Sequence, residues 1–323
     1  MVEIIKADKM GFCFGVDDAV KTVREAIKEN QGRKIFLTNE LIHNPIINLE
    51  MKEKNIIFLN ENPEEVKKED VVIIPAFGIK KELYEELIQK GCEIIDTTCS
   101  IVRNVQIKIK DFNEKGLTTI YFGKIGHEET EATVSYADNY LIFTNQEDID
   151  VLCEYYKTGK DPLEHFKERV SKNFNIEKLD KIGIVAQTTM LKTQVENFFN
   201  QIQQSKANNN ISKQDTICGA TQVRQKGVEE LAEKVKIIIV IGGYNSSNTR
   251  NLAKIAKQKG IIVYHIDGNP NKVTKESISY QPLDSDQEIT KEKWLVYDKI
   301  GVTSGASTPD KVTEKIIEKI SNF

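Results

Sequence analysis

Three of the five cysteines in this chain recur at matching places, and thiolates placed in this way can hold a metal centre. The five are Cys13, Cys92, Cys99, Cys153 and Cys218. An odd number of cysteines in a chain of 323 residues argues against a disulfide framework. The lack of a C-x-x-C pair also argues against a zinc ribbon or a ferredoxin-type cluster. Any metal site must therefore gather cysteines from distant parts of the chain.

Cys13, Cys99 and Cys218 each open a predicted helix that is followed by a strand and a polar loop. The predicted helices are Val16–Glu29, Ile101–Glu114 and Thr221–Lys234. The polar loops keep the spacing, since His43 lies 30 residues after Cys13, His127 lies 28 after Cys99, and Asn248 lies 30 after Cys218. Such self-similarity indicates three copies of one structural unit.

Each copy continues with a middle strand and then a further strand ending in small or hydroxyl-bearing residues. The strand-and-turn segments are Val72–Gly78, Gly183–Thr189 and Gly301–Ser307, with amphipathic helices expected at Lys80–Lys90, Leu191–Gln203 and Pro309–Ile320. Alternating strands and helices predict an α/β fold with three small parallel sheets. The predicted domains are residues 14–97, 98–215, and 216–323 with the N-terminal strand 1–13 added. Two polar stretches, Glu154–Asp180 and Lys275–Lys293, are interpreted as surface elaborations.

The loops that carry these residues all follow strands, so in parallel sheets they lie at the carboxyl edge, where function collects. If three units face a pseudo-threefold axis, the three thiolates meet there. Each cysteine also starts a helix, where partial positive charge favours thiolate over thiol. Three thiolates can bind three corners of a cubane cluster and leave one iron open as a Lewis acid and electron relay. Cys92 and Cys153 lack counterparts and are interpreted as small apolar residues.

The histidines also divide into those that recur at matching places and those that do not. His43 and His127 occupy matched loops, whereas His165 and His265 do not and are interpreted as surface or packing residues. The segment Asn245–Asn248 predicts a helix N-cap, and Thr308 predicts a cap followed by Pro309 in the first helical turn. Capped helix starts present N–H groups that bind phosphate. Glu129 has acidic neighbours, Glu128 and Glu131, so a solvated charge cluster is the alternative to a functional role.

Composition excludes several classes of function. A net charge of −4 gives no indication of a nucleic-acid surface. No run of eighteen apolar residues occurs, so no membrane span is predicted. The segment Met1–Lys6 does not resemble a signal peptide, and we expect a cytoplasmic protein.

Eight short motifs, taken together and in order, closely resemble those of the 4-hydroxy-3-methylbut-2-enyl diphosphate reductase (LytB) family. They are Gly11–Val16, Ile42–Asn44, Asp96–Cys99, Gly126–Glu129, Gln187–Thr189, Asp215–Cys218, Asn245–Asn248 and Gly305–Ser307. The resemblance implies a trefoil of three similar α/β domains around a central 4Fe-4S cluster. It implies the last step of the non-mevalonate isoprenoid route, in which an allylic alcohol diphosphate is reduced to isopentenyl and dimethylallyl diphosphate.

The resemblance also implies roles for individual residues. Cys13, Cys99 and Cys218 would be the cluster ligands, Glu129 would deliver protons, and Thr188 would orient the substrate hydroxyl. The expected substrate-binding residues are His43, Phe77, His127, Gln187, Ser246, Ser247, Asn248 and Ser307. Phe77 stands where the commonest bacterial pattern has a histidine, and phenylalanine cannot donate a hydrogen bond to diphosphate.

The turn Pro75–Gly78 and the insertion after Asp150 resemble the cyanobacterial and plant-type branch of the family, which implies reduced ferredoxin or flavodoxin as electron donor. Two alternatives stay open. A quinolinate-synthase-like protein shares the three-domain plan and an open-iron cluster but performs condensation and dehydration. A non-catalytic iron–sulfur redox sensor would need an output surface, commonly a basic patch, of which the balanced charge gives no sign.

Overall fold

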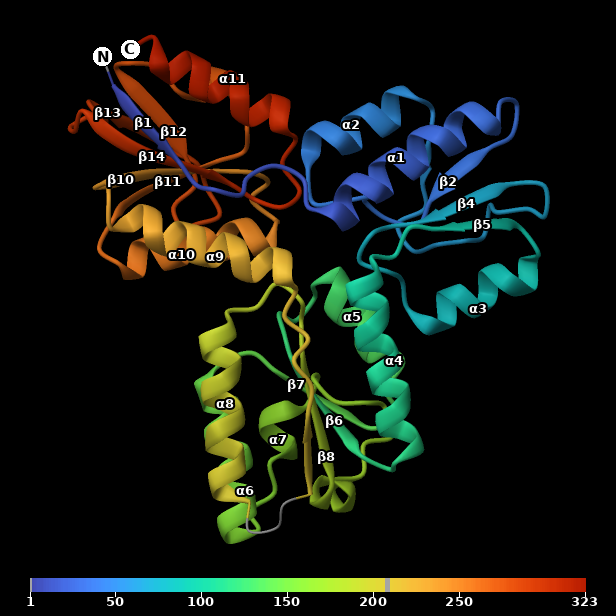
Figure 1. Cartoon of the computed structure of the whole chain (residues 1–323). Helices are drawn as coiled ribbons and strands as arrows, with labels where there is room; N and C mark the ends of the chain where they lie inside the picture. Colours follow the sequence, from blue (N-terminus) through green and yellow to red (C-terminus); the bar gives the residue numbers. More distant parts are fainter. Residues whose placement is uncertain (1, 207–209) are drawn as a thin grey trace. The chain divides into compact units, whose positions relative to one another are not determined.

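Three sheets of four parallel strands alternate with helices along the part of the chain that the structure describes (Figure 1). This computed structural model describes residues 2–206 and 210–323, so Met1, at the start of the predicted N-terminal strand, lies outside it. A two-stranded antiparallel ribbon accompanies the three sheets. The predicted α/β class with three small parallel sheets is therefore confirmed.

The first sheet along the chain has the strand order β3-β2-β4-β5. Its strands are β2 (Ile35–Leu37), β3 (Ile57–Phe58), β4 (Val71–Ile74) and β5 (Glu93–Asp96), and the neighbouring helices are α1 (Phe14–Glu29) and α3 (Lys81–Lys90). Phe36 lies opposite both Ile57 and Val72 in the parallel register. The alternate residues Val72 and Ile74 pack with Phe36 and with Leu87 of α3 in one buried cluster. Period-two burial of this kind covers one face of the sheet with a helix.

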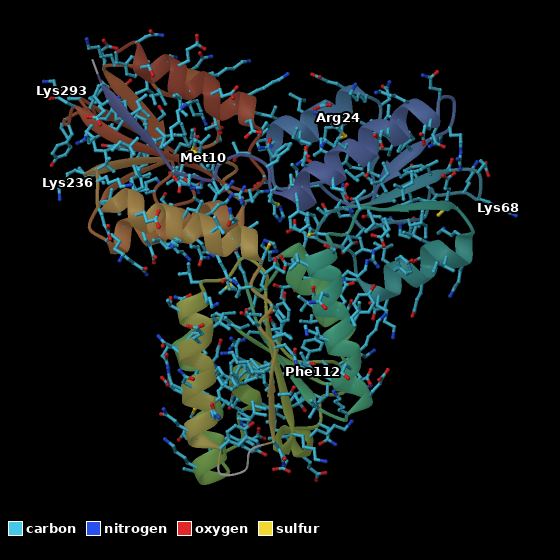
Figure 2. The ribbon with its side chains drawn as sticks, viewed as in Figure 1. Met10, Arg24, Lys68, Phe112, Lys236 and Lys293 are labelled. Carbon is cyan, nitrogen blue, oxygen red and sulfur yellow. The ribbon has the colours of Figure 1, made fainter. Side chains whose placement is uncertain are left out.

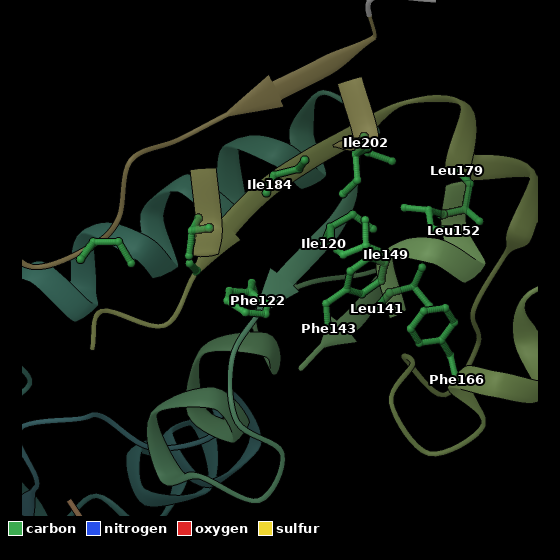
Figure 3. Close-up of a cluster of buried hydrophobic side chains, with 14 residues drawn as sticks. Ile120, Phe122, Leu141, Phe143, Ile149, Leu152, Phe166, Leu179, Ile184 and Ile202 are labelled. Atoms are coloured by element: carbon green, nitrogen blue, oxygen red, sulfur yellow. The ribbon is translucent and has the colours of Figure 1, made fainter. Parts of the chain in front are cut away.

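The second sheet has the order β7-β6-β8-β9. Its strands are β6 (Thr118–Phe122), β7 (Tyr140–Phe143), β8 (Ile182–Ala186) and β9 (Ile211–Lys213), and its helices are α4 (Ser100–Glu114), α5 (Glu128–Val134), α6 (Gln146–Thr158), α7 (Leu163–Phe166) and α8 (Lys192–Ser205), with the 3-10 turn η1 (Ile176–Asp180). Figure 3 shows one face of this sheet, where Ile120, Phe122 and Ile184 meet side chains from α6 and α8. Phe112 of α4 packs on the opposite face with Tyr121 and Val185.

The third sheet has the order β1-β14-β10-β11. Its strands are β1 (Glu3–Lys6), β10 (Ile237–Ile241), β11 (Ile262–Ile266) and β14 (Lys299–Ser304), and its helices are α9 (Gly219–Ala232), α10 (Ser247–Gln258) and α11 (Asp310–Ser321). Ile4 of β1 pairs with Ile300 of β14. The N-terminal strand thus completes the sheet formed by the end of the chain, as the sequence predicts.

By compactness the chain divides into two units. The terminal unit comprises Met1–Asp18, Ile42–Glu53 and Cys218–Phe323, and the central unit comprises Ala19–Leu41 and Lys54–Ile217. Helix α2 (Pro45–Glu53) belongs to the terminal unit, whereas the strands before and after it belong to the central unit. The three predicted domains, 14–97, 98–215 and 216–323 with 1–13, stay a prediction about how these sheets are grouped.

Both polar stretches interpreted as surface elaborations contribute to the core, so that interpretation was wrong. Within Glu154–Asp180, the side chains of Phe166 and Leu179 are fully buried, and the Phe166 ring stacks on Phe143 with 5.0 Å between centroids (Figure 3). Within Lys275–Lys293, a hairpin of β12 (Ser277–Tyr280) and β13 (Ile289–Glu292) follows the turn η2 (Pro270–Lys272). The hairpin buries Ile278, and the fully buried Trp294 lies two residues after its end.

The loops between these elements carry exposed charged side chains. Lys68, Lys236 and Lys293 project from loops at the margins of the molecule, whereas Phe112 points inward (Figure 2). Among the described residues, the helices are all too short or too polar to cross a membrane.

Candidate functional site

The Cys13 loop of the terminal unit is held against the turn that follows β14. The N–H of Cys13 donates to the carbonyl of Ala306 at 3.0 Å, and the N–H of Gly11 donates to the hydroxyl of Ser304 at 2.8 Å. Since β1 and β14 are parallel neighbours, both loops leave the same edge of the sheet. The thiol therefore lies at the carboxyl edge, as the topology requires.

The Cys99 loop of the central unit repeats this arrangement. The N–H of Cys99 donates to the carbonyl of Ala76 at 2.9 Å, and Ala76 occupies the turn after β4 as Ala306 does after β14. Asp96 braces the loop, because its carboxylate accepts the N–H of Thr98 at 2.9 Å and the guanidinium of Arg103 at 2.6 Å. Burial raises the pKa of Asp96, but these hydrogen bonds outweigh burial and hold the pKa below its ordinary value.

All three matched cysteines stand at helix starts. Cys99 and Cys218 are the N-cap residues of α4 and α9, and Cys13 directly precedes α1. Each is half-buried. Cys92 and Cys153 are also half-buried, but burial raises the pKa of both thiols, as expected for packing residues.

Arg224 places a buried positive charge beside two of these cysteines. It lies on α9 and is 5% exposed. Burial lowers the pKa of its guanidinium, whereas the charges of Cys13 and Cys218 raise it. Arg224 was not predicted as a site residue. A usable signal is its place six positions after Cys218, because Ala19 and Val105 occupy the matching positions after Cys13 and Cys99.

The His43 loop belongs to the terminal unit and is tied to the turn after β14. The hydroxyl of Ser307 donates to the carbonyl of His43 at 3.3 Å, and the Asn44 amide donates to the carbonyl of Ser307 at 2.8 Å. The Asn44 side chain also caps α2, since its oxygen accepts the N–H of Ile46 at 3.0 Å. No role was predicted for Asn44, and these contacts explain its place in the Ile42–Asn44 motif.

The loop after β10 brings Ser246, Ser247 and Asn248 to the start of α10. Ser246 is the N-cap, and its hydroxyl accepts the N–H of Thr249 at 3.3 Å, as the sequence predicts. Asn248 is 5% exposed, and within residues 2–206 and 210–323 neither its amide nitrogen nor its oxygen has a hydrogen-bond partner. A buried amide without a partner is costly, which is typical of a group that serves a ligand.

Two glycines allow these loops to approach closely. A Cβ on Gly305 would lie 1.9 Å from the hydroxyl of Thr249, and a Cβ on Gly243 would lie 2.7 Å from the carbonyl oxygen of His43. A side chain at Gly243 would displace the backbone of His43, and one at Gly305 would displace Thr249 on helix α10. One cap differs from its prediction: helix α11 begins at Asp310 with Pro309 as N-cap, and Thr308 instead donates its hydroxyl to the carbonyl of Ile241 at 3.0 Å.

Glu129 and Thr188 meet in the central unit at the ends of β6 and β8. The backbone N–H of Thr188 donates to one carboxylate oxygen of Glu129 at 2.7 Å, and its hydroxyl donates to the other at 3.0 Å. Glu129 is only 4% exposed, so the solvated charge cluster considered for it is wrong. The acidic neighbours concealed this, because α5 turns Glu129 inward while Glu128 and Glu131 are only half-buried.

His127 is the N-cap of α5, and its Nδ1 accepts the N–H of Glu129 at 3.2 Å. In the neutral ring this places the proton on Nε2.

Gln187 is fully buried: its oxygen accepts the N–H of Lys124 at 3.0 Å, and its nitrogen has no hydrogen-bond partner among the described residues. Phe77 is buried in the turn after β4. The Tyr121 hydroxyl is also buried nearby, and burial, followed by the charge of Glu129, raises its pKa.

Each unit therefore gathers its own share of the predicted residues. The terminal unit holds Cys13, His43, Cys218, Ser246, Ser247, Asn248 and Ser307, and the central unit holds Phe77, Cys99, His127, Glu129, Gln187 and Thr188. The sequence motif of the LytB protein family matches residues 4–321. This chain belongs to the LytB protein family.

Similar proteins agree with this membership over the full length of the LytB chain. A protein of Crocosphaera subtropica named 4-hydroxy-3-methylbut-2-enyl diphosphate reductase is 41% identical over 99% of this chain and 84% of its own. One of Picosynechococcus with the same name is 40% identical over the same shares. Both organisms are cyanobacteria, in agreement with the branch indicated by the Pro75–Gly78 turn.

Two solved structures resemble the LytB chain. A structure of (E)-4-hydroxy-3-methyl-but-2-enyl diphosphate reductase, described as the terminal enzyme of the non-mevalonate pathway, has a TM-score of 0.62 and 31% identity, covering 100% of both chains. The reductase from Plasmodium falciparum has a TM-score of 0.78 over 98% of this chain and 87% of its own. At 24% identity the second likeness shows the fold alone.

Proposed function

We propose that this LytB chain is itself a 4-hydroxy-3-methylbut-2-enyl diphosphate reductase. The allylic hydroxyl of the substrate leaves as water after uptake of two electrons and two protons, and isopentenyl or dimethylallyl diphosphate remains. Whole-chain similarity to proteins of that name supports the substrate. The structural observation that carries the proposal is the buried Glu129 carboxylate, bonded twice to Thr188.

We further propose that Cys13, Cys99 and Cys218 hold one 4Fe-4S cluster. Their half-buried thiols at three helix starts suit thiolate ligation, and the cationic Arg224 beside two of them suits an anionic centre. Three ligands leave one iron without a protein ligand. When bound, the cluster supplies single electrons and a Lewis-acid iron.

Glu129 is the proposed proton donor. Hydroxide is a poor leaving group, so protonation of the substrate oxygen by a carboxylic acid is needed for its loss as water. The two hydrogen bonds from Thr188 fix the carboxyl orientation. The Thr188 hydroxyl can rotate from Glu129 to the substrate hydroxyl, because a hydroxyl both donates and accepts. This pair thus orients the alcohol and delivers the proton.

The diphosphate is assigned to neutral donors and histidines. Ser246, Ser247 and Asn248 lie at the start of the 12-residue helix α10, where backbone N–H groups and the helix dipole favour an anion. His43 and Ser307 lie on the loops tied to this region of the terminal unit. His127 and Gln187 are the corresponding donors of the central unit. Phe77 offers an apolar surface only, so its proposed contact is with the hydrocarbon part of the substrate.

One experiment separates this function from the alternatives. The protein is purified without oxygen, its iron and acid-labile sulfide are counted, and it is supplied with dithionite-reduced methyl viologen and the hydroxylated diphosphate. The proposal predicts about four irons per chain and release of both C5 diphosphates. A cluster with no turnover would favour a redox sensor, whereas formation of quinolinate from its precursors would favour the quinolinate-synthase-like alternative.

The proposed physiological donor is reduced ferredoxin or flavodoxin in the cytoplasm. The same assay tests this when viologen is replaced by each reduced protein in turn. Turnover with neither, under conditions where viologen supports it, would contradict this part of the proposal.

A further inference from the structure

Arg224 is a cation at a position that its repeat partners fill with apolar residues. It lies six residues after Cys218, where the corresponding helices have the buried residues Ala19 and Val105. Replacement of an apolar core residue by a guanidinium costs several kcal/mol unless a negative charge compensates it. The buried guanidinium of Arg224 in the third copy therefore requires a negatively charged partner.

The contacts of Arg224 join the Cys13 loop to the start of its own helix, α9, within the terminal unit. One terminal nitrogen donates to the carbonyl of Gly11 at 2.8 Å, and the other donates to the carbonyl of Ala220 at 3.0 Å. Gly11 lies two residues before Cys13, and Ala220 lies two residues after Cys218. The guanidinium is thus anchored between the Cys13 loop and the first turn of α9, which Cys218 caps.

These carbonyls do not balance the charge of Arg224. In the described part of the chain, Arg224 forms no ion pair with a carboxylate, and its buried Nε–H has no hydrogen-bond acceptor. Its surroundings are instead the Cys13 loop and the start of α9 at Cys218, with Asp310 as a further acidic neighbour. Cys13 and Cys218 are proposed cluster ligands, so a negative centre bound there would supply the counter-charge of Arg224.

We propose that Arg224 is an electrostatic positioning residue that compensates the negative charge of the centre on Cys13 and Cys218 and thereby raises its reduction potential. The proposal rests on the proposed function, since it assigns the centre to a cluster. Reduction adds an electron to an already anionic site, and a fixed neighbouring cation stabilises the reduced form more than the oxidised form. Loss of this cation makes the cluster harder to reduce.

The test compares Arg224→Gln, Arg224→Lys and Lys226→Gln in the complete, cluster-loaded protein. Lys226 lies on the same helix and is exposed, so its replacement removes an equal charge where solvent screens it. The measurement is the midpoint potential from an anaerobic redox titration followed by electron paramagnetic resonance, with iron content and circular dichroism on each sample. Arg224→Gln should lower the equilibrium constant for one-electron reduction about tenfold, which corresponds to about 59 mV. Arg224→Lys and Lys226→Gln should stay near the parent potential.

The cluster content of the variants also tests the role of the Arg224 charge. If Arg224→Gln loses its cluster while Arg224→Lys keeps a cluster at the parent potential, the charge is needed for assembly and the inference holds. Equal potentials in Arg224→Gln, Lys226→Gln and the parent would overturn it, and so would a folded Arg224→Lys that cannot hold a cluster, because donor geometry would then matter more than charge. A parent protein without any cluster would instead contradict the proposed function itself.

Discussion

Glu129 and Thr188 form a two-point contact in which one residue donates both its backbone N–H and its hydroxyl to the two carboxylate oxygens of the other. The carboxylate is almost completely buried and lies at the end of strands whose loops carry the other predicted site residues of the central unit. Such a contact orients the carboxyl group in one way. Proton delivery by Glu129 depends on this orientation.

The variant Glu129→Gln should keep its cluster and lose turnover. The glutamine amide preserves the geometry, because its oxygen can accept the Thr188 N–H and its nitrogen can donate to the Thr188 hydroxyl. Loss of the acid should lower kcat by about 10²–10⁴. Steady-state assays with reduced viologen measure this, with Glu131→Gln on the same helix as the control. Rates within twofold of the parent in Glu129→Gln would exclude proton delivery by this residue.

The variants Thr188→Val and Thr188→Ser separate the hydroxyl from the shape of the side chain. Valine has no hydroxyl to donate to Glu129, so one buried carboxylate oxygen loses its hydrogen bond. The loss of this bond costs about 1–3 kcal/mol of free energy. We expect kcat/KM to fall by roughly 10–100-fold for valine and by less than about threefold for serine. Equal losses in both variants would indicate that Thr188 acts through packing alone.

The variant Asn248→Asp should weaken binding of the diphosphate. It keeps the size of the side chain but places a carboxylate where the proposal has a neutral amide facing an anion. Like charges repel strongly in a buried site, so the Kd of a bound diphosphate should rise at least about tenfold at low ionic strength. Isothermal titration with the product diphosphates measures this without turnover. Gln258→Glu, which adds the same charge at the exposed end of α10, should bind normally.

His265 predicts a specific pH dependence of stability. Burial lowers its pKa to about 4, with a further lowering from the charge of Arg250, although its ring nitrogen lies 2.9 Å from the carbonyl of Gly242. The unfolded chain, with a pKa near 6.5, binds the proton more tightly. Stability from this group is therefore fully present above pH 6.5 and is lost as the pH falls toward 4.

The expected size is about 2 kcal/mol between pH 7 and pH 5. Urea unfolding at the two pH values measures the free energy of unfolding for the parent and for His265→Gln, whose amide can still donate to Gly242. The variant should show a smaller loss than the parent by about that amount. The same loss in both proteins would mean that other groups cause the acid sensitivity.

The sequence predicts the repeated part of this structure well, because strands and cysteines recur in register. Each matched cysteine is followed, as predicted, by a helix (α1, α4 and α9) and then by a strand (β2, β6 and β10). The N-terminal strand was assigned to the last sheet for the same reason, since its place before Cys13 matches that of β5 before Cys99. Patterns that occur three times are difficult to misinterpret.

Features that occur once were predicted poorly. Phe166 and Leu179 are core residues within a charged insertion, and their burial depends on contacts with distant strands. Burial of Glu129 depends on Thr188, 59 residues away. Arg224 resembles a solvated helix residue until its carbonyl partner Gly11, 213 residues distant, is seen. In each case the deciding contact is long-range, so the local pattern does not contain it.

We expect the three matched cysteines, and not Cys92 or Cys153, to hold one cluster. Anaerobic iron and sulfide analysis of the five single cysteine-to-serine variants distinguishes the two groups. Cys92→Ser and Cys153→Ser should retain the iron content and visible absorption of the parent. Cys13→Ser, Cys99→Ser and Cys218→Ser should each lose most of both. Full iron content with unchanged absorption in any of these three, or loss of the cluster in Cys92→Ser or Cys153→Ser, would exclude this set of ligands.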